Sequence, residues 1–199
     1  MILVNGEKFK DEEFHNGEVI LETPGVIKED KNIIELFFQN NKDIATLTFL
    51  RHWLMDKHPE AECELVMKYC PYERMDREIN QQMFSMRYFA EIIADLKFSK
   101  VSILDAHSRV CVEEMQKLGV NVDELNLEDY INKVIELFQP DYICYPDKGA
   151  YNKYPNVLNN IKLPYFYGNK VRDLANKGHI TEYKLVNAPD LTDKKIIII

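Results

Sequence analysis

Short apolar runs alternate with segments of helical periodicity along this 199-residue chain, and this alternation is the feature that most constrains its fold. Leu65 to Met67 predicts a strand, the apolar residues from Ser85 to Leu96 recur at helical spacing, and Val101 to Leu104 predicts the next strand. Parallel strands need a crossover connection between them, which is usually a helix. The order therefore predicts an α/β protein in which parallel sheets are flanked by helices on both faces.

The remaining elements are predicted from the same patterns. Ile2 to Val4 reads as a strand closed by a tight turn at Asn5-Gly6, and Asp43 to Lys57 reads as an amphipathic helix. A later helix is expected to be capped by Asn126 and ended by Pro140. Further strands are expected at Val19–Leu21, Tyr142–Tyr145, Tyr165–Tyr167, Tyr183–Val186 and Ile196–Ile199.

We expect two domains, residues 1–140 and residues 141–199. The second would contain about sixty residues, which is short for a domain. It ends with four consecutive isoleucines, Ile196 to Ile199, a run that suits a strand buried on both faces better than an exposed end. We therefore expect the native chain to continue and the second domain to be incomplete here.

The composition narrows the classes of partner. Asp and Glu number 33 against 25 Lys and Arg, which gives a formal net charge of −8 and argues against binding to nucleic acid or to anionic lipid. No apolar run approaches the ~20 residues of a membrane span, and no signal peptide is recognisable, so a cytoplasmic protein is expected. The cysteines, at positions 63, 70, 111 and 144, form no CxxC pair and read as reduced thiols rather than as a zinc knuckle or a redox motif.

Polar residues follow four of the predicted strands directly. Because ligands of open parallel sheets bind at the carboxyl ends of the strands, we expect these residues to meet at such edges. Each segment also has an ordinary structural interpretation, as a turn aspartate or a solvated surface charge. The segments are Pro71–Arg77, Asp105–His107, Pro146–Gly149 and Gly168–Asp173.

The order of these segments resembles the ribose-phosphate diphosphokinase family. Enzymes of that family make phosphoribosyl pyrophosphate from ATP and ribose 5-phosphate, and their two halves share the type I phosphoribosyltransferase fold. Residues 14–18 (Phe-His-Asn-Gly-Glu) resemble the family's Phe-x-Asn/Asp-x-Glu element, and residues 71–77 resemble its Pro-Tyr-Ala-Arg-Gln-Asp-Arg/Lys signature. Residues 103–107 are similar to its Val-Asp-Leu-His strand end, residues 146–150 to its Pro-Asp-x-Gly-Gly, and residues 170–172 to its Lys-x-Arg.

The resemblance covers nearly all of the chain and implies a role for each segment. The active site would lie at a subunit interface of a homo-oligomer, because the adenine of ATP would be held by residues of the neighbouring subunit. The implied ATP-binding residues are Phe14, Asn16, Glu18, Arg74, Met75, Asp76 and His107, the Mg²⁺ ligands are His107 and Asp147, the ribose 5-phosphate residues are Asp147 and Gly149, and the catalytic cations are Lys170 and Arg172.

These residue types suit the implied chemistry. Diphosphoryl transfer asks the protein mainly for alignment and for neutralisation of charge. A carboxylate such as Asp147 suits Mg²⁺, whereas the His107 imidazole would act through water or on ATP itself. Phe14 can stack on adenine. We place Lys170 and Arg172 in a loop after their strand, where both can turn toward a phosphoryl group.

Two positions depart from the family pattern. Met75 stands where the family has glutamine, and Ala150 stands where it has the second glycine of Pro-Asp-x-Gly-Gly. After the position of Ile199 the family continues with an acidic Asp-Asp and a Thr-Gly-Gly-Thr loop that binds the 5-phosphate. A chain that ends at Ile199 is therefore expected to be inactive by itself.

Two alternative functions stay open. One is a catalytically inactive relative that serves as a regulatory or assembly subunit. The other is a phosphoribosyltransferase acting on a nicotinamide or purine base, which would share the fold. The second is disfavoured because the elements around Phe14 and Arg74 belong to the ATP-binding half and have no use in such an enzyme.

Overall fold

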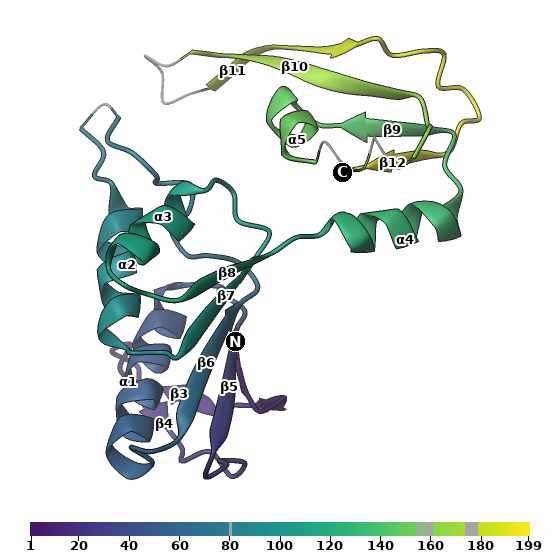
Figure 1. Ribbon diagram of the computed structural model, residues 1–199. Coiled ribbons are helices and arrows are strands. Elements are labelled where there is room, and N and C mark those ends of the chain that lie inside the picture. The colour runs from purple at the N-terminus through teal and green to yellow at the C-terminus, as the bar shows by residue number, and fades with distance from the viewer. Residues whose placement is uncertain (80, 155–156, 158–160, 174–178) are drawn as a thin grey trace. The chain divides into compact units, whose positions relative to one another are not determined.

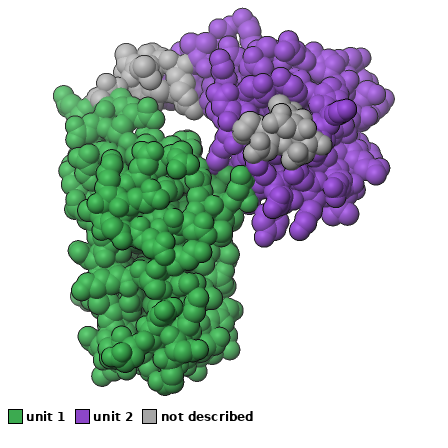
Figure 2. All heavy atoms as spheres, in the orientation of Figure 1, with its two compact units in different colours: residues 1–126 green, residues 127–199 purple. Residues whose placement is uncertain are grey.

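The chain divides into two units, Met1–Asn126 and Leu127–Ile199, each with its own hydrophobic core (Figure 2). The computed structural model describes residues 1–79, 81–154, 157, 161–173 and 179–199, and the side chains of residues 172 and 173 lie outside that description. The division precedes the predicted domain boundary at residue 140, because Ile135 packs with Ile143 and Tyr145 in the core of the second unit. The boundary at residue 140 stays a prediction.

A mainly parallel sheet forms the centre of the first unit (Figure 1). Within the described residues its strand order is β2-β1-β5-β6-β7-β8, and β5 to β8 run parallel, as the alternation of strands and helices predicted. The strands are β1 (Ile2–Val4), β2 (Glu7–Lys8), β5 (Lys31–Leu36), β6 (Glu62–Met67), β7 (Lys100–Leu104) and β8 (Val122–Leu125).

The helices α1 (Asn41–Lys57), α2 (Ser85–Asp95) and α3 (Val110–Lys117) lie on one face of this sheet (Figure 1). Each strand from β5 to β8 lies beside the one before it, and right-handed crossovers then place the connecting helices on the same side. Helices were expected on both faces, but among the described residues of the first unit they lie on this face alone. On the other face of β5 and β6 the ion pairs Lys31–Glu64 and Lys68–Glu35, both at 2.8 Å, lie among partly exposed side chains.

Helix α1 begins at a capping box. The Asn40 side chain accepts a hydrogen bond from the Lys42 N–H at 2.9 Å, and the Asp43 carboxylate accepts one from the Asn40 N–H at 3.3 Å. Both bonds satisfy amides that have no partner inside the helix, so the helix starts two residues before the predicted Asp43. Leu47, Leu50 and Leu54 are buried in the core of the first unit.

Two hairpins lie near the start of the chain. Asn5 and Gly6 have φ values of 51° and 86°, so the predicted tight turn between β1 and β2 is confirmed. The second hairpin joins β3 (Asp11–Glu13) to the predicted strand β4 (Val19–Leu21), and together they form a separate two-stranded sheet. Residues 14–18, which include three of the predicted adenine-binding residues, form its turn.

The second unit contains a sheet with strand order β11-β10-β9-β12 among the described residues. The strands β12, β9 and β10 are parallel, and β11 pairs antiparallel with β10. The predicted strands are confirmed, although β10 and β11 are longer than expected. The elements are α4 (Glu128–Phe138), β9 (Tyr142–Tyr145), α5 (Lys148–Lys153), β10 (Tyr165–Asp173), β11 (His179–Val186) and β12 (Ile196–Ile198).

Two predictions about this unit need correction. The N-cap of α4 is Leu127, which makes no capping side-chain bond, and not Asn126. Lys170 and Arg172 lie on the strand β10 and not in a loop, because β11 pairs with β10 from Tyr167 to Asp173 and holds this segment extended. The helix end before Pro140 is as predicted, with Gln139 in the left-handed conformation at φ 48°. In the described part of the chain, no helix has the length and apolar character needed to cross a lipid bilayer.

Candidate functional site

The turn between β3 and β4 orders two of the predicted adenine-binding residues. The Asn16 side-chain amide donates a hydrogen bond to the Glu18 carboxylate at 2.8 Å, and the Glu18 N–H donates one back to Asn16 Oδ1 at 3.2 Å. Phe14 beside them is 56% exposed, so its ring is available for stacking. These three residues therefore present an aromatic face and polar groups from one turn.

The hairpin is tied to helix α1. Lys42 donates to Asp11 at 2.9 Å and lies 3.6 Å from Glu13, so one helix cation joins both carboxylates of β3. An open groove of about 950 Å³ runs between the turn and the start of α1, and Phe14, Glu18 and Lys42 are among its lining residues. A concave surface of this size is within the range of small-molecule sites.

The loops that follow β6 and β7 are hydrogen-bonded to each other. The His107 N–H donates to Glu73 Oε2 at 3.0 Å, and the Ser108 hydroxyl donates to Asp76 Oδ2 at 3.1 Å. Because β6 and β7 are neighbouring parallel strands, both loops leave the same edge of the sheet. The predicted ATP loop, residues 71–77, and the predicted strand end at His107 are therefore brought together.

Asp76 is held in place mainly by Arg77. The guanidinium donates two hydrogen bonds, from Nε at 2.8 Å and from Nη2 at 3.1 Å. These bonds to Arg77, with the bond from Ser108, hold the pKa of the Asp76 carboxyl below its usual value despite burial. Asp76 is thus an ionised residue that stabilises the loop, whereas Arg74 and His107 have exposed side chains.

Unusual backbone conformations shape both loops. Tyr72 and Asp105 have φ values of 61° and 54°, in the left-handed region that non-glycine residues seldom occupy. Tyr72 is held there by its hydroxyl, which donates to Asn41 Oδ1 at 2.7 Å, and by a ring contact with Phe89. The Asp105 N–H donates to the Leu125 carbonyl at 3.0 Å. Backbone of this kind is common at functional sites.

In the second unit, Asp147 and Lys170 form an ion pair. Asp147 is the N-cap of α5, where Oδ1 accepts from the Ala150 N–H at 2.9 Å, and its Oδ2 accepts from the Lys170 ammonium. The bond from Lys170 is the main reason that the pKa of Asp147 lies below its usual value. Lys170 reaches Asp147 because β10 continues past Tyr145, the last residue of β9.

Two glycines make room around this ion pair. A Cβ at Gly149 would lie 2.9 Å from Asp147 Oδ1, so a larger residue would disturb the cap. A Cβ at Gly168 would lie 2.5 Å from the Pro146 carbonyl oxygen and would overlap the Tyr183 hydroxyl. That hydroxyl donates to the same Pro146 oxygen at 3.3 Å, directly before Asp147. Tyr183 therefore helps to position the Pro146-Asp147 segment.

The predicted site residues fall into three groups within the two units. The first unit holds the hairpin group and the loop group, and the second unit holds the ion-pair group, in which Gly149 lies next to the Asp147 cap. Met75 is half-buried, and its carbonyl accepts from the Met86 N–H at 3.2 Å. The side chain of Arg172 lies outside the described residues. Each group lies within one unit, and ligand binding by these residues stays a prediction.

Sequence reasoning missed the roles of Glu73, Ser108 and Tyr183. Glu73 was read as part of a charged surface loop, yet it is buried and bonded to a residue 34 positions later. Its only signal in the sequence is its place inside the 71–77 segment. The contact of Tyr183 with Pro146 depends on Gly168, and a glycine inside a strand is a recognised sign of close approach.

The chain is similar to proteins of known name and structure. No family model matches the chain. A ribose-phosphate pyrophosphokinase of Saccharolobus solfataricus is 20% identical over 201 residues, and one of Sulfolobus acidocaldarius is 24% identical over 199 residues. Each alignment covers 96% of this chain and 65% of the relative, so the chain spans less than two thirds of these relatives' length.

A solved structure has the same fold. The crystal structure of phosphoribosylpyrophosphate synthetase from Mycobacterium smegmatis superimposes with a TM-score of 0.68 and 16% identity, over 96% of this chain and 61% of that one. At this identity the match shows the fold. The predicted α/β class, with parallel sheets flanked by helices, is confirmed.

Proposed function

We propose a function from the premise that this chain is a distant relative of the ribose-phosphate pyrophosphokinases, as its motifs predicted and as the two curated relatives support. The proposed reaction is diphosphoryl transfer from ATP to ribose 5-phosphate. The anomeric hydroxyl oxygen bonds to the β-phosphorus, the bond from that phosphorus to the α–β bridging oxygen breaks, AMP leaves, and the hydroxyl proton is released. The products are phosphoribosyl pyrophosphate and AMP.

The observation that carries this proposal is the pair of hydrogen bonds between the loops after β6 and β7. Through Glu73 to His107 and through Asp76 to Ser108, the two segments that match the family's ATP-binding motifs are held at one edge of one sheet. Burying a carboxylate is costly unless it is hydrogen-bonded. The buried carboxylates of Glu73 and Asp76 have hydrogen-bond partners on the loop after β7, and these bonds hold the two loops together. In the proposal, Arg74 binds the ATP phosphates from this edge.

The hairpin supplies the proposed adenine contacts. Phe14 stacks on the purine, and Asn16 and Glu18 pair with its polar edge. The mutual hydrogen bonds of Asn16 and Glu18 leave each with further capacity, since an amide nitrogen has two hydrogens and a carboxylate accepts several bonds. In a homo-oligomer, this hairpin would serve the active site of a neighbouring subunit.

Asp147 fits a role as a Mg²⁺ ligand, because it is an ionised and partly exposed carboxylate. His107 fits less well as a direct ligand, since Mg²⁺ prefers oxygen, and we assign its imidazole to water-mediated or nucleotide contacts. When bound, Mg²⁺ would neutralise phosphate charge. Lys170 uses one ammonium hydrogen on Asp147 and has two more for phosphoryl oxygens, which suits a cation that stabilises the transferring group.

Calorimetry with Mg²⁺·ADP tests the nucleotide site in the first unit. The chain is expected to bind, and Arg74→Ala should weaken binding about tenfold or more, because a charged hydrogen bond contributes about 1.5–3 kcal/mol. Lys100→Ala is the matched control: Lys100 begins β7, at the edge of the sheet opposite His107, and pairs with Asp123. No binding by the folded chain, or equal effects of both substitutions, would overturn the proposal.

An assay of AMP release from ATP by the full-length protein, with and without ribose 5-phosphate, tests the reaction. Release that requires the sugar phosphate supports the transferase. Nucleotide binding by the full-length protein with no sugar-dependent release would contradict catalysis and favour the regulatory or assembly alternative. Pyrophosphate release from phosphoribosyl pyrophosphate and a base, with no use of ATP, would favour the base phosphoribosyltransferase.

A further inference from the structure

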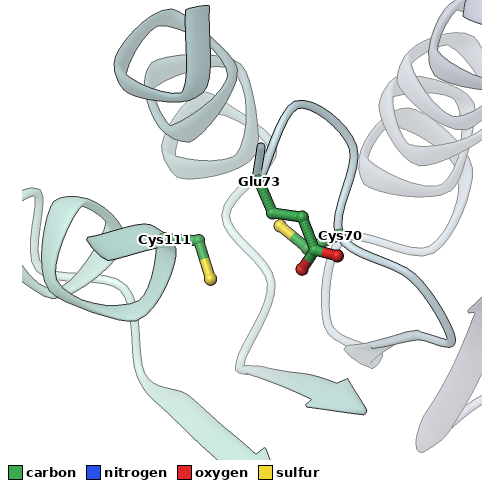
Figure 3. Close-up of side chains that lie close together, drawn as sticks. All are labelled: Cys70, Glu73 and Cys111. Atoms are coloured by element: carbon green, nitrogen blue, oxygen red, sulfur yellow. The ribbon is translucent and has the colours of Figure 1, made fainter. Parts of the chain in front are cut away.

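Two cysteines and one glutamate converge in the interior of the first unit (Figure 3). Cys70 and Glu73 belong to the loop after β6, and Cys111 belongs to α3. The two sulfur atoms and a carboxylate oxygen of Glu73 all lie within 4.8 Å of one another, and all three residues are buried. Figure 3 shows the side chains of Cys70 and Glu73 on one side of the group and that of Cys111 opposite them.

The local backbone explains how Cys70 and Glu73 come to share a side. The Glu73 N–H donates to the Cys70 carbonyl at 3.3 Å, which closes a turn over Pro71 and Tyr72. Many zinc sites take two of their ligands from residues separated by two positions on a tight turn. Cys70 and Glu73 have this spacing, with a carboxylate in the place of the second thiolate. The third ligand, Cys111, comes from helix α3.

Glu73 and Cys111 each make a hydrogen bond to the loop after β7. The His107 N–H donates to Glu73 Oε2 at 3.0 Å, and the Cys111 thiol donates to the Ser108 carbonyl at 3.4 Å. The bond from the His107 N–H can persist when Glu73 binds a metal, and outer hydrogen bonds of this kind commonly fix the direction of a ligand atom. The Cys111 thiol would lose its proton on becoming a thiolate ligand, and with it the bond to the Ser108 carbonyl. The cluster therefore already has part of the outer support that a metal site needs.

The chemistry of the donors selects the ion. Thiolates are soft ligands that favour Zn²⁺ over Mg²⁺ or Ca²⁺. Zn–S bonds of about 2.3 Å and Zn–O bonds of about 2.1 Å place tetrahedral ligand atoms about 3.6–3.8 Å apart. The three donor atoms, all within 4.8 Å of one another, thus need only a small contraction.

We propose that Cys70, Glu73 and Cys111 form a zinc site, with the fourth tetrahedral position filled by water. The site would join Cys70 and Glu73, in the loop after β6, to Cys111 in helix α3. The site does not depend on the proposed reaction. It rests on contacts within the first unit alone.

Metal analysis of the folded, reduced chain tests the proposal. After equilibration with Zn²⁺ and removal of weakly bound metal, one Zn²⁺ per chain should remain, and Co²⁺ in its place should give thiolate-to-cobalt charge-transfer absorption. Cys70→Ser and Cys111→Ser should each lower the affinity by more than the ~10–100-fold typical for loss of an outer hydrogen bond. Glu73→Gln should lower it too, because a neutral amide is a poor zinc ligand.

Cys63→Ser and Cys144→Ser are the matched controls, since both remove buried cysteines outside the cluster and should leave binding unchanged. Circular dichroism establishes that each variant is folded, and the Co²⁺ spectrum of the unaltered chain tests the site without any substitution. The proposal is overturned if the folded, reduced chain retains no zinc, or if Cys70→Ser and Cys63→Ser retain it equally.

Discussion

One carboxylate, that of Asp147, does two things in the second unit. Its Oδ1 caps α5 and its Oδ2 accepts from Lys170, so the same side chain fixes the start of a helix and holds the catalytic candidate on β10. In the reaction proposed for the full-length protein, the Lys170 ammonium should matter more to the transition state than to the bound substrate, because charge develops on the transferring group.

Lys170→Ala should therefore reduce turnover far more than it reduces affinity for ATP. We expect a loss of about 10²–10³-fold in kcat, the range for loss of one preorganised electrostatic contact, with a change of less than about tenfold in the dissociation constant. Steady-state AMP release and calorimetry measure the two quantities. Lys184→Ala, on the adjacent strand β11, is the control, since Lys184 pairs with Glu182. Equal losses of turnover and affinity would reject the role assigned to Lys170.

At the scale of elements, β10 and β11 hold the ion pair in position through Gly168. The missing Cβ allows the Tyr183 hydroxyl to cross β10 and to donate to the Pro146 carbonyl at 3.3 Å. Because Pro146 directly precedes Asp147, the packing of one strand pair is connected to the geometry of the cap. A substitution on β10 should therefore change the geometry of the Asp147 cap at the start of α5.

Gly168→Ala should destabilise the chain by about 1–3 kcal/mol, the usual cost of overpacking, because the new methyl group overlaps Tyr183 and lies against the Pro146 oxygen. Urea denaturation measures the loss. Gly25→Ala is the control, since nothing lies within 4 Å of its Cβ position. The double variant Gly168→Ala/Tyr183→Ala should recover part of the loss. If it recovers none, Tyr183 is not the group that Gly168 accommodates.

Sequence patterns predicted most of the buried strands and missed β5 and the helix α3. The strand β5 was not predicted, because its sequence Lys-Asn-Ile-Ile-Glu-Leu places a buried asparagine where an apolar residue is expected. Asn32 can be buried there since its carbonyl oxygen accepts from the Asn5 side chain and the Lys28 N–H, both at 2.9 Å. The contact with Asn5, 27 positions earlier, cannot be read from local periodicity.

The candidate site was likewise predicted only in part: the motifs indicated residues, but not the contacts that hold them. The family motifs drew attention to His107 and Asp147 because motif order along the chain is preserved, but the bonds to them come from Glu73 and Lys170 on other segments. The cysteines were read as unrelated thiols, since their spacing contains no CxxC pair. Cys70 and Cys111 each lie close to a predicted strand-end loop, and that shared position was the available signal.

For the whole molecule, the two units differ in the size of their cores. The first unit buries side chains from β1, β5, β6, β7 and its three helices in one cluster, whereas the described core of the second centres on Ile143 and Tyr145. We expect the fragment 1–126 to fold alone, with dispersed amide NMR signals and cooperative thermal unfolding, because it contains its whole sheet. The fragment 127–199 is the comparison and should be less stable. An unfolded 1–126 fragment would show that its core depends on the second unit.

Acid should destabilise the chain through carboxylates in both units. Bonds from Arg77 to Asp76 and from Lys170 to Asp147 hold both pKa values below the usual 3.8. The native state therefore favours the ionised forms, so their stabilisation is complete above this value and is lost as the pH falls through the lowered pKa values. The free energy of unfolding in urea should thus decrease below about pH 4, by up to about 1.4 kcal/mol per pH unit for each group.

Asp76→Asn should flatten this dependence, while Asp56→Asn, at an exposed position of α1, controls for the change in net charge. An unchanged slope in Asp76→Asn would mean that the Arg77 pair contributes nothing to acid sensitivity.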